Sequence, residues 1–148
     1  MMGPLWDRID MNIQVASVSY SELDSNEETE TTEKIKARVE KVRRLQEERY
    51  KDENFICNSW LPLSLFKKHC QMTDAACDLL EKIYSKKQFS GREYTRVIRV
   101  ARTIADMSGE KIIQINHVSE AIQFKMLKLG EGWNYAREIS ALDLVFTN

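Results

Sequence analysis

Four arginines lie close together in the sequence, and their side chains are of a type that binds anions. Arg92, Arg96, Arg99 and Arg102 recur at steps of three and four residues, which places neighbours together on a helix surface. The guanidinium group is a planar, permanent cation that can hold phosphate or carboxylate through parallel hydrogen bonds. Arg96 and Arg99 are therefore candidate contacts to an anion or to DNA. The alternative is a solvated charged face, which is the commoner outcome for charge-rich helices.

The cysteines and histidines form no pattern that predicts chemistry. Cys57, Cys70 and Cys77 are odd in number and include no Cys-x-x-Cys pair, so no disulfide framework is predicted. The spacing of His69, Cys70, Cys77 and His117 matches no set of metal ligands. A nucleophilic cysteine–histidine pair stays open as an alternative, although no local signature supports it. We expect buried, inert thiols and no metal site.

The helix that must position the arginines has both of its ends written in the sequence. Ser90 followed three residues later by Glu93 is a capping box, in which each side chain satisfies a backbone N–H of the first turn. Gly109 supplies the residue that most easily adopts the left-handed conformation closing a helix. Between these ends, apolar residues at three- and four-residue steps predict a buried face, formed by Tyr94, Val97, Ile98, Ala101, Ile104 and Ala105.

Other helices are predicted around this one. Glu33 to about Lys51 is highly charged with a thin apolar stripe, which is typical of a helix laid on a surface. Pro62 opens a short helix to about Gln71, and Thr73 can cap the next helix. A short, extended connection precedes the last helix. The apolar stripe of the charged helix consists of Ile35, Val39, Val42 and Leu45, and the connection consists of Ile112, Ile113 and Ile115. The predicted inward residues are Ala76, Leu79, Leu80, Ile83 and Tyr84 after Thr73, and Val118, Ala121, Ile122, Met126 and Leu129 in the last helix, which Gly130 and Gly132 end.

The first stretch differs from the rest because it has the periodicity of a β-strand. Ile9, Met11, Ile13 and Val15 alternate with polar residues. A lone strand is not stable, so we expect its partner to be another chain or a sheet that this sequence lacks. Without such a partner we expect the segment to be poorly ordered.

Composition indicates a mainly α protein without a global charge. The chain has 148 residues, 43% of them hydrophobic and 30% charged, and its formal net charge is −1. That balance gives no overall attraction to nucleic acid or an anionic membrane, so any such binding must come from a local patch. No apolar run is long enough to cross a bilayer and the N-terminus lacks a signal pattern, so a cytoplasmic protein without a membrane partner is expected.

Three stretches resemble the C-terminal part of AAA+ ATPases of the magnesium-chelatase-related, ComM-like branch. Residues 3–10, Gly-Pro-Leu-Trp-Asp-Arg-Ile-Asp, resemble the family's Gly-Pro-Leu-Leu-Asp-Arg-Ile-Asp. Residues 89–106, from Phe-Ser-Gly-Arg to Ala-Arg-Thr-Ile-Ala-Asp, resemble the lid motif that opens with Leu-Ser-Ala-Arg. Residues 115–122, Ile-Asn-His-Val-Ser-Glu-Ala-Ile, are similar to the final lid helix. The resemblance covers roughly Gly3 to Leu127 in the family's order.

The resemblance implies roles for two arginines. Arg8 lies where related ATPases have an arginine finger, which reaches the nucleotide of a neighbouring subunit, although on its residues alone Arg8 would be assigned a salt bridge with Asp7 or Asp10. Arg92 lies where they have a second sensor, a nucleotide-binding arginine at the lid. The implied cofactors of the intact protein are ATP and magnesium. The implied partners are the AAA+ core, neighbouring subunits of a ring and, through the intact protein, DNA.

The departures from the family limit what this chain should do alone. It has no Gly-x-x-x-x-Gly-Lys-Ser/Thr loop and no acidic cluster after an apolar strand, so no nucleotide binding or ATPase activity is expected of it by itself. We expect the C-terminal portion of a chelatase subunit or DNA motor, with an AAA+ core remnant in 1–23, an acidic linker and charged helix in 24–52, a helical lid in 53–130 and a tail in 131–148. The alternative is a stand-alone helical module that binds protein or DNA through its arginine-rich helix.

Overall fold

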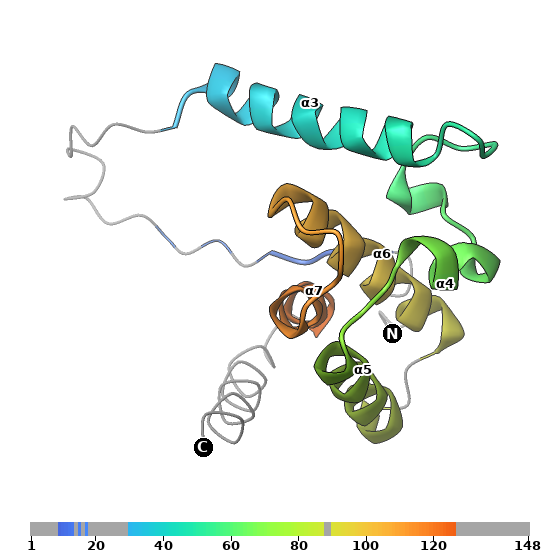
Figure 1. Ribbon diagram of the computed structural model, residues 1–148. Coiled ribbons are helices and arrows are strands. Elements are labelled where there is room, and N and C mark those ends of the chain that lie inside the picture. The colour runs from blue at the N-terminus through green and yellow to red at the C-terminus, as the bar shows by residue number, and fades with distance from the viewer. Residues whose placement is uncertain (1–8, 14, 16, 18–29, 88–89, 127–148) are drawn as a thin grey trace.

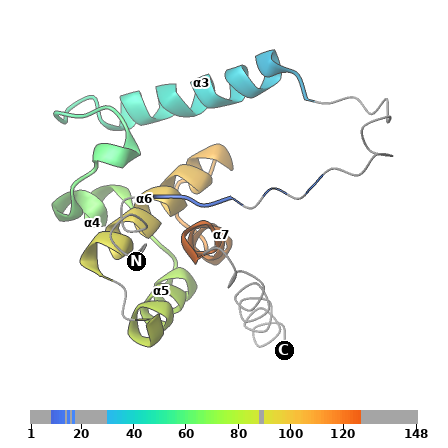
Figure 2. The same ribbon diagram turned by 180° about the vertical axis from the view of Figure 1, so that it is seen from behind.

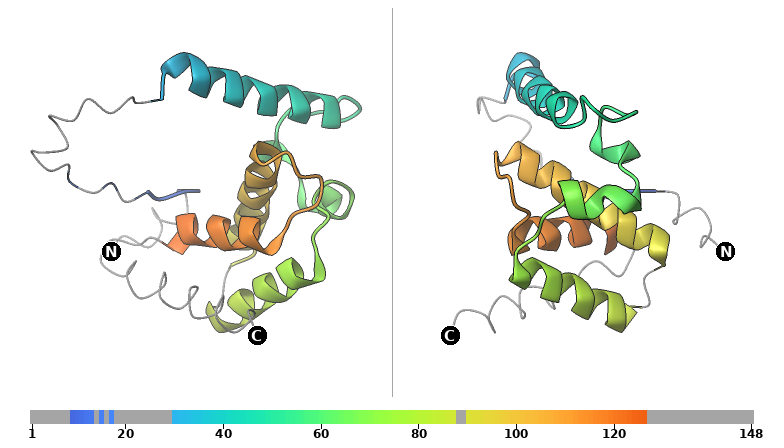
Figure 3. Two further views of the ribbon diagram at one scale, coloured as in Figure 1. Left: turned by 60° about the vertical axis from the view of Figure 1, so that its left-hand side comes forward. Right: turned by 45° about the vertical axis from the view of Figure 1, so that its right-hand side comes forward.

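The arginine helix α6 (Gly91–Met107) lies at the centre of the computed structural model, with the other helices arranged around it (Figure 1). The structure describes residues 9–13, 15, 17, 30–87 and 90–126. Helix α3 crosses one side of α6, and α5 and α7 lie on the other side (Figures 1 and 3). In chain order the described elements are α3 (Thr32–Arg49), the 3₁₀ turns η1 (Asn58–Trp60) and η2 (Leu63–Leu65), α4 (Phe66–His69), α5 (Asp74–Lys87), α6 and α7 (Ile115–Met126).

Both predicted ends of α6 are confirmed. The backbone N–H of Glu93 donates to the Ser90 hydroxyl at 3.2 Å, and the Ser90 N–H donates to the Glu93 carboxylate at 3.0 Å, which completes the capping box. At the other end Gly109 has φ +76°, and the N–H groups of Gly109 and Glu110 bond to the carbonyls of Asp106 and Ala105 at 3.1 and 2.8 Å. This pair of bonds is a Schellman motif, so α6 begins and ends by local interactions.

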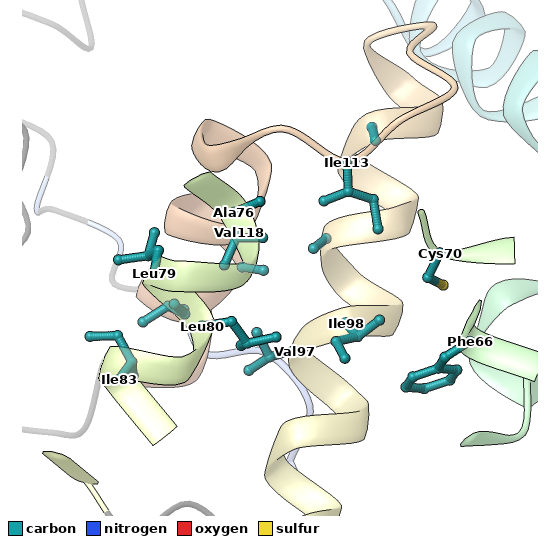
Figure 4. Close-up of a cluster of buried hydrophobic side chains, with 14 of the residues drawn as sticks. Phe66, Cys70, Ala76, Leu79, Leu80, Ile83, Val97, Ile98, Ile113 and Val118 are labelled. Carbon is teal, nitrogen blue, oxygen red and sulfur yellow. The ribbon is translucent and has the colours of Figure 1, made fainter. Parts of the chain in front are cut away.

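The core lies where α5, α6 and α7 meet, and Figure 4 shows its side chains pointing toward one another. The predicted inward faces are largely confirmed, since the core includes Leu80 of α5, Ile98 of α6 and Val118 of α7. The inward prediction is wrong for Tyr84, which is 42% exposed at the outer edge of α5 and makes an edge-on contact with Tyr94. Each fully buried aliphatic side chain of this core, such as Leu80, Ile98 or Val118, stabilises the fold by about 1.5–3 kcal/mol.

The connections between the helices also follow the sequence. Pro62 precedes η2 and α4, and the Thr73 hydroxyl accepts from the Ala76 N–H at 3.3 Å at the start of α5. Of the predicted extended connection, Ile113 forms a parallel bridge with Met72, whereas Ile115 is already the first residue of α7. The Ile113 N–H donates to the Gln71 carbonyl at 2.8 Å, which fastens the segment before α5 to the segment before α7.

Helix α3 is a surface helix, as its charge predicts. Thr31 caps it, and its end nearest residue 49 contacts α6 (Figure 3). Of the predicted apolar stripe only Val42 is buried, while Ile35, Val39 and Leu45 are exposed. The cover that α3 gives to α6 is therefore confined to its second half.

Of the described residues at the N-terminal end, Ile9, Asp10 and Asn12 contact α6 and α7, whereas Ile13 and Val15 are exposed. The Asn12 N–H donates to the Phe124 carbonyl at 2.8 Å. No strand is assigned among residues 9–13, 15 and 17, and the strand that would pair with a sheet outside this chain stays a prediction. Arg8, the acidic linker up to residue 29, Leu129, Gly130, Gly132 and the tail 131–148 lie outside the described residues. None of the described helices is long and apolar enough to cross a membrane.

Candidate functional site

The four arginines of α6 lie in three different environments, so they cannot all have the same role. Arg92 lies in the first turn, next to the capping box, and is exposed. The N-terminus of a helix carries a partial positive charge because its first N–H groups point outward. An exposed guanidinium at that end adds a full charge to this field. Arg92 therefore presents an exposed cation at the start of α6, beside the Glu93 carboxylate of the capping box.

Arg96 and Arg99, the two candidate anion contacts, are engaged within the chain. Arg96 Nε lies 2.6 Å from the carboxylate of Asp10, and its side chain is only 17% exposed. Arg99 Nε donates to the carbonyl of Leu61 at 2.9 Å. Both side chains bind acceptors of this chain, so they connect α6 to the N-terminal segment and to the loop before η2.

Arg102 is buried and belongs to the architecture of the helix end. Its side chain is 1% exposed and donates to the Asp106 carboxylate one turn later at 3.1 Å. It also donates to the carbonyls of Lys111, at 2.6 Å, and Glu110. A cation at a helix C-terminus is stabilised by the carbonyl groups gathered there. Arg102 therefore ties the turn after α6 back onto the helix.

A buried polar network lies at the C-terminal end of α6 and is centred on Asp106, whose side chain is fully buried. Arg49, at the end of α3, binds both carboxylate oxygens in a bidentate pair, one bond measuring 2.7 Å. Asn58 in η1 donates to the same carboxylate at 2.9 Å, and Gln46 donates at 3.4 Å. Together with Arg102 these donors neutralise and satisfy the buried carboxylate. The network joins α3, η1 and the end of α6.

Two groups beside this carboxylate have shifted pKa values. Burial acts to lower the pKa of Arg49, but the hydrogen bond and charge of Asp106 outweigh it, so the pKa is raised. Burial raises the pKa of Tyr50 to about 12, while the neighbouring Arg49 opposes part of that shift. The Tyr50 hydroxyl donates to the Asn58 side-chain oxygen at 2.6 Å. Tyr50 is therefore held neutral and serves as a donor within the network.

Sequence reasoning missed this network because most of its members are far apart in the chain. Arg49 and Asp106 are separated by 57 residues, and Gln46 and Asp106 by 60. Only the four-residue step from Arg102 to Asp106 could have been read as a helix-surface ion pair. Even that step predicts an exposed pair rather than a buried one.

The cysteines divide between two environments. Cys70 is buried, and burial raises the pKa of its thiol to about 11, in agreement with an inert thiol. The same prediction is wrong for Cys77, which is exposed because it lies on the outer side of α5, while Cys57 is half-buried. Within the described part of the chain no three His, Cys, Asp or Glu side chains are grouped closely enough to hold a metal ion.

The two histidines have structural contacts. His117 is buried in the first turn of α7, and its Nδ1 accepts the Gln114 N–H at 3.1 Å. This bond has the role of the back-reaching side chain in a capping box. His69 Nε2 lies 3.2 Å from Glu53, which also binds Lys68 at 2.6 Å. His117 thus caps the start of α7, and His69 connects the last residue of α4 to Glu53.

Comparison with known proteins places this arrangement in a family. The chain is 33% identical over 128 residues to the competence protein ComM of Haemophilus influenzae, an alignment of 86% of this chain and 24% of that protein. It is 27% identical over 128 residues to the uncharacterized protein YifB of Escherichia coli, with the same two coverages. An uncharacterized Mycobacterium tuberculosis protein, Rv2897c, is 27% identical over 84% of this chain and 25% of its own length. The chain thus spans about a quarter of the length of these relatives.

The region of the match coincides with the helical domain described above. Residues 29–125 match the family described as magnesium chelatase, subunit ChlI C-terminal, a range that contains every helix from α3 to α7 apart from the last residue of α7. The match covers the Asp106 network, the capped start of α6 and the core shared by α5, α6 and α7. This chain belongs to the magnesium chelatase ChlI C-terminal family, as the helical C-terminal domain of a ComM-like protein.

Proposed function

We propose that this chain is the helical lid of an AAA+ ATPase that works as an oligomeric ring, and that it supplies two arginines to ATP hydrolysis. Arg92 contacts the phosphates of nucleotide bound to its own subunit, and Arg8 reaches the nucleotide of the neighbouring subunit. ATP and magnesium are held by the AAA+ core. The observation that carries this proposal is the placement of Arg92, which is exposed at the capped start of α6.

The chemistry suits positioned arginines. Phosphoryl transfer spreads negative charge over the transferred group and the leaving oxygen, so it is promoted mainly by fixed positive charge. A supplied arginine is worth roughly 10³–10⁵ in rate in enzymes where it has been tested. Arg92 would meet the phosphates with both its own charge and the partial charge of the helix start.

Of the two activities left open for the intact protein, we favour a motor acting on DNA over metal insertion. Support comes from the relative named as a competence protein, to which the chain is 33% identical. The stand-alone module that would bind protein or DNA through an arginine face gains no such support. Arg96, Arg99 and Arg102 bind acceptors within the chain, which removes them from such a face.

A chimera tests the proposal. The matching quarter of the Haemophilus influenzae ComM protein is replaced by this chain, and ATP hydrolysis is measured. Arg8→Ala and Arg92→Ala should each reduce kcat, by roughly 10³-fold for the finger, with a much smaller change in nucleotide binding. Arg44→Ala, which removes an exposed arginine of α3, is the matched control and should change little. Hydrolysis undiminished in both of the first two variants would refute the proposal.

Mixed rings test whether Arg8 acts across a subunit boundary. An Arg8→Ala chimera is mixed with a ComM subunit that lacks its phosphate-binding lysine. Each inactive subunit keeps the half-site that the other has lost, so some interfaces in mixed rings should recover activity. Assembled mixed rings that remain inactive would count against action in trans.

A further inference from the structure

Residues Ile9 to Asn12 lie against the first half of α6 and the second half of α7, where three contacts hold them (Figure 2). The Asp10 carboxylate pairs with Arg96 at 2.6 Å. Lys125 Nζ donates to the Ile9 carbonyl at 3.2 Å. The Asn12 N–H donates to the Phe124 carbonyl at 2.8 Å. Two of these bonds involve the backbone of Ile9 and Asn12, so the backbone of the segment is fixed as well as the Asp10 side chain.

The ammonium group of Lys125 lies between the backbone at Ile9 and the carboxylate of Glu93. Its side chain is only 7% exposed, and Nζ lies 4.0 Å from Glu93 as well as near the Ile9 carbonyl. A buried ammonium is costly unless acceptors surround it, so its position is strongly determined. Glu93 is the residue that completes the capping box next to Arg92. Lys125 therefore connects the start of α6 to the backbone at Ile9.

The N-terminal segment is thus fastened to the same two turns of α6 that carry Arg92. Arg92 and Arg96 are separated by four residues and lie on the same side of the helix. Consecutive Cα atoms are about 3.8 Å apart, so a backbone fastened at Ile9 restricts where the neighbouring Arg8 can be presented. The fastening and the helix start form one mechanical unit.

We propose that Arg96 and Lys125 are positioning residues that hold the segment following Arg8 on the lid, so that Arg8 and Arg92 move together. This inference rests on the proposed function of those two arginines. A lid that shifts when its own nucleotide changes would then shift Arg8 at the neighbouring nucleotide. Arg96 and Lys125 would transmit the state of one site to the next without contacting either nucleotide.

Amide exchange in this chain tests the fastening without any ATPase. By NMR, exchange of the Asn12 N–H should become roughly threefold faster in Arg96→Ala, because Asp10 is 60% exposed and a solvent-facing ion pair is weak. Lys125→Met, which removes a charged donor of similar length, should accelerate it by about tenfold. Arg44→Ala is the control and should leave Asn12 unchanged. Helix amides of α6 should be unaffected in Arg96→Ala, which separates local release from unfolding.

Charge reversal distinguishes a specific pair from general loosening. Asp10→Arg combined with Arg96→Asp should restore slow exchange at Asn12, while either single reversal should accelerate it. Unchanged exchange at Asn12 in both Arg96→Ala and Lys125→Met would overturn the fastening. Failure of the double reversal to restore protection would overturn the assignment to this ion pair.

The chimera with ComM tests the link to catalysis. Arg96→Ala should lower kcat by roughly threefold to tenfold at unchanged KM, and the double reversal should recover it, because only the presentation of Arg8 is altered. Full kcat in variants that exchange Asn12 quickly would overturn the positioning role. Full hydrolysis in Arg8→Ala would instead overturn the proposed function, and with it the link to catalysis, whereas the exchange rates decide the fastening by themselves.

Discussion

Asp106 shows how a single buried carboxylate can organise a helical domain. Four side chains donate to it, and they come from α3, η1 and α6 itself. Asp106→Ala would leave the guanidinium groups of Arg49 and Arg102 without their anion in a buried site. Removing one partner of a buried ion pair costs about 3–5 kcal/mol, so this variant should lose most of the stability of a domain of this size.

Urea unfolding followed by circular dichroism measures this loss. Asp78→Asn on the exposed side of α5 is the matched control and should stay within about 0.5 kcal/mol of the original chain. A loss below about 1 kcal/mol in Asp106→Ala would mean that water replaces the carboxylate and that the network is not a structural centre.

At the scale of elements, α6 depends on a residue at each end, and two glycines allow the backbone contribution to be isolated. A Cβ added at either Gly91 or Gly109 would meet nothing within 4 Å, so crowding plays no part in either substitution. Gly109 alone of the two has a positive φ, of +76°. Gly109→Ala should therefore cost roughly 1–2 kcal/mol, the strain of a left-handed alanine.

Gly91→Ala is the counterpart within the first helical turn, and it should be neutral or slightly stabilising because alanine loses less backbone entropy on folding. Thermal unfolding of the two variants provides the comparison. Equal midpoints would show that the Schellman turn is not required to end α6.

At the scale of the whole molecule, stability should fall at alkaline pH. Tyr50 is 1% exposed, packed between Phe55 and His69, and its pKa is raised from the ordinary 10 to about 12. Between these values the unfolded chain loses the proton while the native state keeps it, so the free energy of unfolding decreases as pH rises from about 10 to about 12. Cys70, with a pKa of about 11, acts in the same direction from about pH 9 to 11.

The Tyr50→Phe variant isolates the part of this alkaline loss of stability that is due to ionisation of Tyr50. Its stability should decline less between pH 9 and pH 11.5 than that of the original chain, by about 1–2 kcal/mol at most. Tyr84→Phe, at an exposed position of α5, should follow the original chain. Parallel curves for all three proteins would show that ionisation of Tyr50 is not coupled to unfolding.

The sequence by itself determined the main helices and both ends of α6. The capping box of Ser90 and Glu93, the turn at Gly109 and the cap at Thr73 each involve residues within one helical turn, so their signals are local and readable. The inward faces of α5, α6 and α7 follow from the three- and four-residue spacing of apolar residues. The family motifs likewise singled out Arg92, which lies in the first turn of α6, and its role as a second sensor stays a proposal.

Only the tertiary structure decided what the charged residues do. Spacing puts Arg96, Arg99 and Arg102 on α6, but it cannot reveal that their acceptors are Asp10, the Leu61 carbonyl and the turn after the helix. Lys125 meets the Ile9 carbonyl across 116 residues of sequence. The local sequence around a charged side chain does not indicate whether its partner in the folded protein will be water or a distant carboxylate. That choice is made when the helices pack, because packing sets which charges lose their water and must find a partner.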